Sequence, residues 1–263
     1  MIPDIDLSAG SLFRDHCAMR RIGFPFIRLV RHAARKAAVF AAIGFLVVLS
    51  LPGTRVAAET ADSAATANDL ALIAAAAKGD LDGVAKAMRA GGSIKARDPQ
   101  GRNAVLAAAY GNHVPVALLL MAAGSDVNAK DNQENSAFLL AGAEGYVDVL
   151  KLALRSGADV NSTNRFGGTA LIPAAHHGHV EAVRELLKTK VPVDHVNKLG
   201  WTALLEAIIL GDGGPRHTEI VRLLIAAKAD VNLADKDGVT PLLHARRRGF
   251  AEMVKALEAA GAK

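Results

Sequence analysis

From residue 68 onwards, short apolar stretches recur along the chain and are separated by turns rich in glycine and polar residues. Within these stretches, small residues such as Ala174 and Ala207 allow two helices to approach closely, while Val183 and Leu186 fill the seam between them. A glycine usually follows each predicted helix, where it can adopt the left-handed conformation that ends the helix. The pattern therefore predicts stacked pairs of short helices.

The turns recur at a fixed interval, which indicates an internal repeat. The numbering rises by 33 from each member of one series to the next, and by 38 at the last step: Gly79, Asn112, Gly145, Gly178, Gly211 and Gly249. Asn112 fits this series because asparagine tolerates the left-handed conformation better than most residues. The near-copies GSDVN (124–128), GADVN (157–161) and KADVN (228–232) form a second series. In a third, glycine is followed two residues later by Thr169, Thr202 or Thr240, which we expect to cap a helix.

Together these motifs resemble the ankyrin repeat family, whose unit reads D-x-x-G-x-T-P-L-H-x-A-A-x-x-G-H-x-x-V-V-x-L-L-L-x-x-G-A-D-V-N. The best matches are GGTALIPAAHHGHVEAVRELL (167–187) and DGVTPLLHARRRGFAEMVKAL (237–257), and the resemblance extends from Asn68 to Lys263. It implies an all-α solenoid of about six helix-turn-helix units joined by β-hairpin-like fingers. The units would span approximately 68–97, 98–130, 131–163, 164–196, 197–234 and 235–263.

The chain departs from the family pattern in three ways. Leucine or isoleucine replaces the histidine of the family's Leu-His pair, so more apolar packing is expected there. Lys190 and Lys228 stand where a helix-ending glycine is expected, at a cost on the order of 1 kcal/mol each if the backbone stays left-handed. Residues 212–216 are an insertion between the paired helices of the fifth unit, and both a functional loop and a neutral change of length remain open.

The resemblance places a protein partner on the fingers and inner helices, where the family binds its partners. Phe166 and Leu199 stand one repeat interval apart and should lie in neighbouring fingers, with Trp201 beside them, as an exposed apolar patch. Alternatively, Trp201 folds back and covers the edge of the solenoid. The other positions expected to contact a partner are Arg165 and Lys198 in the fingers, and Tyr110, Glu144, His176, His177, Ile209, Leu210, Arg247 and Arg248 on the inner helices. For the two arginines, an acidic partner and a solvated end of the stack both remain open.

Residues 1–58 read as an export signal. A basic segment precedes an uncharged run at 37–51, which as a helix of about 22 Å is shorter than a bilayer core of about 30 Å. Small residues at Val56-Ala57-Ala58 predict cleavage after Ala58, followed by a flexible linker at 59–67. The true start is either Met1 or Met19. We expect a periplasmic or secreted protein; the alternative is an uncleaved anchor in the inner membrane with the body outside the cytoplasm.

Charge argues against nucleic-acid binding by the repeats, although a local basic patch remains open, and cysteine usage leaves the repeats without a disulfide or a cysteine-ligated zinc site. Residues 1–58 contain 8 basic and 3 acidic residues, whereas the remaining 23 basic and 23 acidic residues cancel. A neutral body lacks the positive charge that nucleic-acid binding requires. The single cysteine, Cys17, lies outside the repeats. His176, His177 and His179 are the only metal-like cluster, but adjacent side chains on a helix should point to different sides, so we expect no metal and no cofactor.

No catalytic motif is present in the sequence, and Asp126, Asp159 and Asp230 occupy repeat positions where a turn role explains them. We therefore expect a non-enzymatic, monomeric, exported module or scaffold that binds an unidentified protein. A membrane-tethered scaffold and a secreted effector acting on host proteins are the alternatives.

Overall fold

The computed structural model describes residues 66–263, and all of its regular elements in that range are helices. This confirms the all-α prediction. The export signal predicted for residues 1–58 lies outside the described residues. Residues 66–78 are helical and pair with the next helix. The bounds of the remaining helices are α3 (Leu81–Arg89), α4 (Ala104–Tyr110), α5 (Val114–Ala122), α6 (Ala137–Ala143), α7 (Val147–Arg155), α8 (Leu171–His176), α9 (Val180–Leu187), α10 (Ala203–Ile209), α11 (Pro215–Ala226), α12 (Pro241–Arg247) and α13 (Ala251–Ala259).

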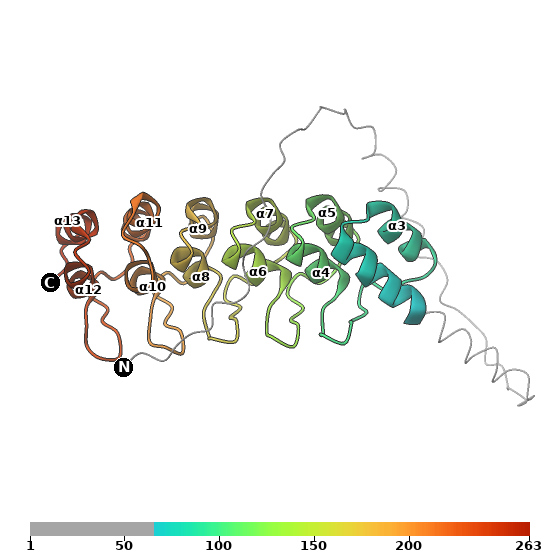
Figure 1. The fold of residues 1–263 in the computed structure, drawn as a ribbon, viewed down its shortest axis with the longest axis horizontal. Coiled ribbons are helices and arrows are strands. Elements are labelled where there is room, and N and C mark those ends of the chain that lie inside the picture. The colour runs from blue at the N-terminus through green and yellow to red at the C-terminus, as the bar shows by residue number, and fades with distance from the viewer. Residues whose placement is uncertain (1–65) are drawn as a thin grey trace, which may run out of the picture. The chain divides into compact units, whose positions relative to one another are not determined.

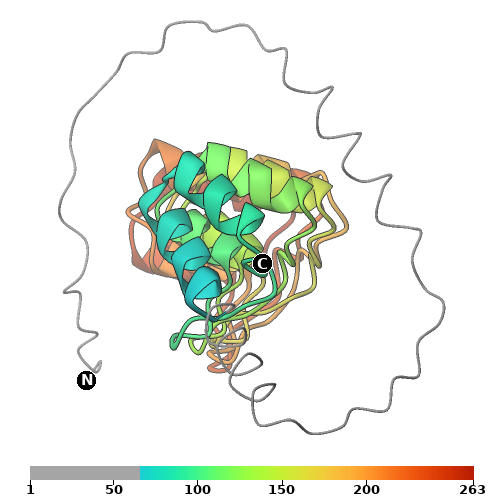
Figure 2. The same ribbon diagram turned by 90° about the vertical axis from the view of Figure 1, so that its right-hand side faces the viewer.

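The helices form two parallel rows (Figure 1). The inner row contains α4, α6, α8, α10 and α12, and the outer row contains α3, α5, α7, α9, α11 and α13. The loops that connect successive pairs project as fingers from the side of the inner row, and Figure 2, along the stack, shows them superposed on one side. No helix in 66–263 is long and apolar enough to cross a membrane.

Polar side chains start most of the inner helices. Thr202 and Thr240 accept hydrogen bonds from the backbone N–H of Leu205 (3.2 Å) and Leu243 (3.3 Å), which confirms their capping role. Asn103 and Ser136 do the same at the equivalent positions. For Thr169 the capping prediction is wrong: its backbone carbonyl accepts from Ile172, and its buried hydroxyl has no hydrogen-bond partner among the described residues.

Within residues 66–263, three residues other than glycine adopt the left-handed conformation, each in one of the glycine series. Asn112 has φ +51°, as predicted, Glu134 has φ +62° and Lys228 has φ +69°. Lys190, in contrast, does not have a positive φ, because the turn around it is closed by Thr189, whose hydroxyl donates to the Leu186 carbonyl. The expected cost of a left-handed side chain, on the order of 1 kcal/mol, therefore applies to Lys228 and not to Lys190.

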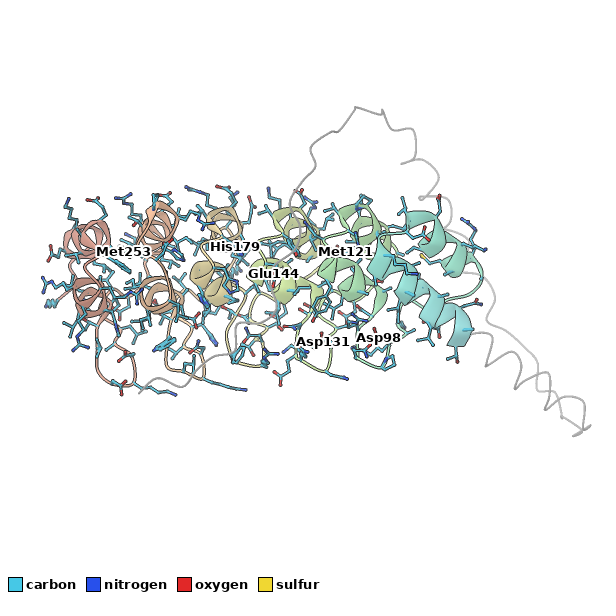
Figure 3. The ribbon with its side chains drawn as sticks, in the orientation of Figure 1. Asp98, Met121, Asp131, Glu144, His179 and Met253 are labelled. Carbon is cyan, nitrogen blue, oxygen red and sulfur yellow. The ribbon has the colours of Figure 1, made fainter. Side chains whose placement is uncertain are left out.

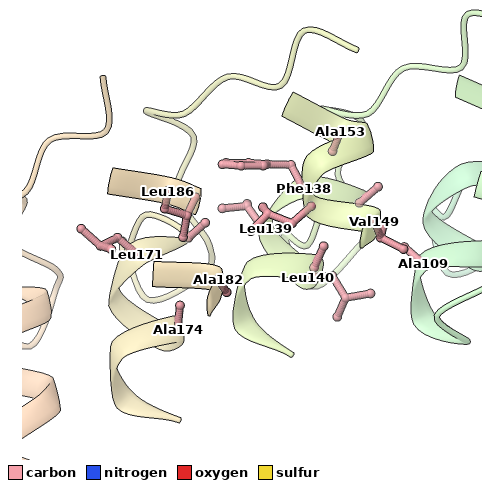
Figure 4. Close-up of a cluster of buried hydrophobic side chains, with 14 of the residues drawn as sticks. Ala109, Phe138, Leu139, Leu140, Val149, Ala153, Leu171, Ala174, Ala182 and Leu186 are labelled. Carbon is pink, nitrogen blue, oxygen red and sulfur yellow. The ribbon is translucent and has the colours of Figure 1, made fainter. Parts of the chain in front are cut away.

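A single apolar core extends from Leu72 to Leu257. Phe138 is the largest fully buried side chain of the described residues, and it lies among buried residues of α6, α7 and α9 (Figure 4). The positions where the family carries histidine are apolar and buried at Leu106, Leu139, Ile172 and Leu205, so packing replaces the missing bonds as expected. Leu243, at the same position of the repeat at 235–263, is 39% exposed.

The insertion at 212–216 is ordered by hydrogen bonds and by the start of α11. Pro215 begins α11, which reaches 12 residues, so part of the insertion extends a helix. The Asp212 carboxylate accepts from the Gly214 N–H (2.8 Å) and contacts Nδ1 of the buried His217 (2.7 Å). Nε2 of His217 lies 2.8 Å from the carbonyl of His176 in the preceding repeat. The inserted residues thus contribute to the junction between the fourth and fifth repeats.

Candidate functional site

The fingers are built on side-chain turns that fix the shape of their tips. In each finger an Asp or Asn oxygen accepts hydrogen bonds from the backbone N–H groups two and four residues later. Asn164 holds Phe166 and Gly168 in this way, and Asn197 holds Leu199 and Trp201, all at 3.0 Å. Asp98 and Asp131 occupy the same position in two other fingers and lie on the finger side of the inner row (Figure 3).

Neighbouring fingers are bonded to each other, which brings Phe166 and Leu199 together. The backbone N–H of Lys198 donates to the carbonyl of Phe166 (2.9 Å), and the Lys198 ammonium donates to the carbonyl of Arg165 (2.8 Å). Phe166 is 52% exposed and Leu199 is 51% exposed. We call these two side chains the finger patch. They lie at the bonded tips of neighbouring fingers, as the repeat interval predicted.

The two finger cations among the predicted partner contacts, Arg165 and Lys198, also stabilise the fingers. The Arg165 guanidinium lies 4.8 Å from the centre of the Phe166 ring and donates to the Gln133 side chain of the preceding finger (3.1 Å). Lys198 uses its ammonium in the bond to Arg165 described above. Both residues are exposed, so they form a polar border around the finger patch while fixing its position.

Trp201, which we expected beside Phe166 and Leu199, is partly buried and is therefore not counted in the finger patch. Its backbone is held by Asn197, and its indole lies between full burial and full exposure. Val196, in the same finger as Leu199, is 46% exposed and was missed by the sequence analysis. The sequence contained the signal, because Val196 is apolar whereas the corresponding positions of the preceding fingers are polar: Arg97, Lys130 and Thr163.

Tyr110 connects an inner helix to a finger. Its hydroxyl donates to Asp131 (2.7 Å) and accepts from Asn135 (3.0 Å), and burial together with the Asp131 bond raises the pKa of Tyr110. The ring is 38% exposed and lines a shallow cleft of about 420 Å³ between two fingers. The cleft is bordered by Pro99, Gln100, Arg102, Asp131, Asn132 and Gln133.

The adjacent histidines at the end of α8 lie close together but contact different repeats. The ring centres of His176 and His177 are 4.6 Å apart. The two side chains nevertheless face different sides, as expected, because Nδ1 of His176 lies 3.6 Å from Glu206 of the next repeat. Nδ1 of His177 lies 2.8 Å from the carbonyl of Ala143 in the preceding repeat. Within residues 66–263, no three His, Cys, Asp or Glu side chains are grouped so that they could hold a metal ion.

Glu206 is a buried carboxyl group on α10 that the sequence analysis did not identify. It is 6% exposed, accepts from the Asn197 amide (2.7 Å) and lies 3.6 Å from Nδ1 of His176. Burial raises the pKa of Glu206 to about 7, and the Asn197 bond opposes this rise. Burial, together with the charges of His177 and His217, lowers the pKa of His176 to about 4. Both groups therefore favour their neutral forms near pH 6, and the contact between them is not an ion pair at that pH.

Comparison with protein-family models shows which family this chain belongs to. A model of ankyrin repeats in three copies matches residues 72–164 and 138–232, and a second ankyrin model matches 215–258. This chain belongs to the ankyrin repeat family.

Solved ankyrin structures agree with this assignment. An ankyrin repeat domain from Acinetobacter baumannii AYE is 54% identical, with a TM-score of 0.71 over 73% of this chain and 98% of that one. The ankyrin repeat protein EF0377 is 34% identical, with a TM-score of 0.69 over 72% of this chain and 96% of that one. The ankyrin repeat domain of Bcl-3, a member of the IkappaB protein family, is 26% identical, with a TM-score of 0.66 over 73% and 86%. No curated protein sequence matches the chain.

The remaining inner-helix positions of this ankyrin domain differ in exposure and in hydrogen bonding. Glu144 is exposed, Leu210 is 40% exposed and Ile209 is partly buried. Arg248 donates to the carbonyl of Gly211 (2.9 Å) and stacks on Phe250, whereas Arg247 makes no hydrogen bond or ion pair with the described residues. Only one of the two predicted arginines is therefore unengaged within this part of the chain.

Proposed function

We propose that this ankyrin domain is an exported protein-binding module and that the finger patch anchors its protein partner. Ankyrin repeat domains generally serve as protein-interaction modules, and the family models together cover residues 72–258. The observation that supports the finger patch is the pairing of Phe166 and Leu199, each about half exposed, at bonded neighbouring finger tips.

The geometry of the finger patch favours binding in two ways. Full burial of a Phe or Leu side chain contributes about 1.5–3 kcal/mol, and aromatic residues are common at the energetic centre of interfaces. The tips are already held by Asn164 and Asn197, so little conformational freedom is lost when a partner binds. Arg165 and Lys198 supply the polar border typical of such a centre.

Phe166→Ala and Leu199→Ala should each weaken capture of the partner about 10- to 100-fold, since truncation of a central anchor removes roughly 1–3 kcal/mol. The wild-type chain is used as bait in the exported fraction, captured proteins are identified by mass spectrometry, and the affinity of a purified hit is then measured. Trp201→Ala should have a smaller effect, and its melting temperature must be measured because the indole is partly buried.

Leu243→Ala is the control, because it removes an exposed leucine from the end of the stack, away from the finger patch. It should bind like the wild type. If Phe166→Ala and Leu199→Ala also bind like the wild type, the partner uses another surface.

For export, mature protein should begin at Glu59, because the basic segment, the apolar run at 37–51 and the small residues before Glu59 match the order of a signal peptide. N-terminal sequencing of the processed protein measures this directly. Ala58→Arg should prevent cleavage at this position and leave a longer protein. A wild-type chain that retains its leader in the membrane fraction would instead support the tethered scaffold.

A further inference from the structure

The outer helices carry a regular pair of charges that is missing from α5. From the third repeat onwards, an acidic residue is followed three positions later by Lys or Arg, and none of these side chains is buried. The pairs are Asp148 and Lys151 in α7, Glu181 and Arg184 in α9, Glu219 and Arg222 in α11, and Glu252 and Lys255 in α13. The corresponding residues of α5 are Pro115 and Leu118.

The outer surface around α5 is therefore apolar. The helix, VPVALLLMA, contains no charged residue, and Leu118 at its midpoint is 51% exposed. Ala85 occupies the equivalent position of α3. In Figure 1, α5 lies between α3 and α7 in the outer row. An uncharged outer helix between two charged neighbours is unusual for a surface that faces only water.

Five of the six charged side chains of α3 and α7 have no ion-pair partner within the described part of the chain. Further along, Arg184 pairs with Glu219 and Arg222 pairs with Glu252, across neighbouring repeats. Next to α5, in contrast, no ion pair within residues 66–263 is formed by Asp82, Lys86 and Arg89 of α3 or by Asp148 and Arg155 of α7. Lys151 is engaged with Glu185 on α9 (3.5 Å).

In place of the monomer expected from the sequence, we propose that the outer surface of α3, α5 and α7 binds a second copy of this chain. The two-fold axis runs along the stack past Leu118 and makes the facing helices antiparallel. In both α3 and α7 the acidic residue lies in the first turn and basic residues lie in the last turn. The antiparallel arrangement places Asp148 opposite Arg155 of the second copy, and Asp82 opposite Arg89 of the second copy. A parallel arrangement would place like charges opposite each other and is disfavoured.

The size of the surface predicts a weak dimer. The three helices have nine residues each, so each is about 13.5 Å long, and at spacings of about 10 Å they offer about 400 Å² per copy. The two copies together would bury about 800 Å², less than the roughly 1,200 Å² of a standard specific interface, so we expect weak, transient association with a dissociation constant on the order of 10–100 µM. The fingers remain free in such a dimer, which would present two finger patches and increase avidity for a multivalent partner.

Sedimentation velocity of the full chain, from about 1 to 500 µM, tests the dimer over the concentration range that its expected affinity defines. The mass should rise from one chain to two. Leu118→Lys, which restores the cation found at this position from α7 onwards, should weaken association at least 10-fold. A wild-type chain that stays at the mass of a single chain over this whole range would overturn the proposal. This includes a chain that remains single and binds lipid vesicles instead.

Charge reversal tests the antiparallel geometry. Asp148→Arg should weaken association, and adding Arg155→Asp to the same chain should restore it, because both facing pairs are then reversed together. Failure of the double variant to recover, with a melting curve like that of the wild type, overturns this arrangement.

Leu199→Lys is the matched control for Leu118→Lys: Leu199 has the same 51% exposure as Leu118 but lies in the finger patch. It should dimerise normally and lose partner capture, whereas Leu118→Lys should show the reverse.

Discussion

Glu206→Gln should raise the free energy of unfolding by about 3 kcal/mol at pH 8.5 and have little effect at pH 4, because the folded protein buries a carboxyl group whose pKa is about 7. The glutamine keeps an oxygen that can accept from the Asn197 amide, and its own amide can donate to Nδ1 of His176. Equilibrium urea unfolding of both proteins, at several pH values, gives the difference directly.

The direction of this pH dependence follows from the raised pKa. In the unfolded chain Glu206 ionises near its ordinary value of 4.5, whereas in the folded protein it retains its proton up to about pH 7. Below pH 4.5 both states hold the proton and the buried carboxyl group carries no charge penalty. As the pH rises from 4.5 to 7, the unfolded state loses the proton first, and the wild type loses stability that Glu206→Gln keeps.

Glu181→Gln is the control for this experiment. Glu181 lies on the outer helix α9, its side chain is 69% exposed and it pairs with Arg184 (3.3 Å). An exposed pair of this kind contributes less than about 1 kcal/mol, so the change in stability should be small at every pH. If Glu206→Gln stabilises the protein equally at pH 4 and pH 8.5, its effect comes from packing and not from the buried charge.

The repeat interval made most of the fold predictable from sequence. It determines which segments pair, and it predicts that Phe166 lies beside Leu199. Rules for helix caps and turns, which use only neighbouring residues in the sequence, were less reliable where the surrounding structure offers an alternative. Thr169 resembles Thr202 in sequence, yet its hydroxyl is buried without a partner among the described residues, and only Thr202 caps its helix. Lys190 and Lys228 likewise occupy equivalent positions, but only Lys228 is left-handed, because Thr189 offers the turn at Lys190 a different closure.

The candidate site was predictable in position but not in detail. A sequence shows that Arg165 and Lys198 lie in the fingers, but not that Lys198 donates to the next finger's backbone or that Arg165 covers the Phe166 ring. The burial of Glu206 depends on two neighbouring elements, the finger of Asn197 and the helix of His176, which are brought together only by stacking. Leu118, in contrast, could have been found by aligning the outer helices on their charges.

Phe138→Ala should lower the free energy of unfolding by about 3–5 kcal/mol, because the side chain is fully buried and its removal leaves a cavity. Phe138 stands where the other repeats carry Val105, Leu171, Leu204 and Leu242. Its ring therefore fills more space than the repeat requires, and it lies among buried side chains of neighbouring helices (Figure 4). Because stacked repeats are stabilised mainly by their neighbours, a cavity in the third repeat weakens its packing on both sides.

Phe138→Leu separates the effect of volume from that of position. It restores the residue type that the fourth and fifth repeats use, so it should cost about 1–2 kcal/mol, clearly less than alanine. Urea unfolding followed by circular dichroism measures both variants, and an unchanged urea dependence shows that the folded state is retained. If Phe138→Ala costs no more than Phe138→Leu, the repeats close around the gap and the cavity argument fails. Capture of the partner by the folded fraction should stay normal, because the finger patch is built on the fourth and fifth repeats.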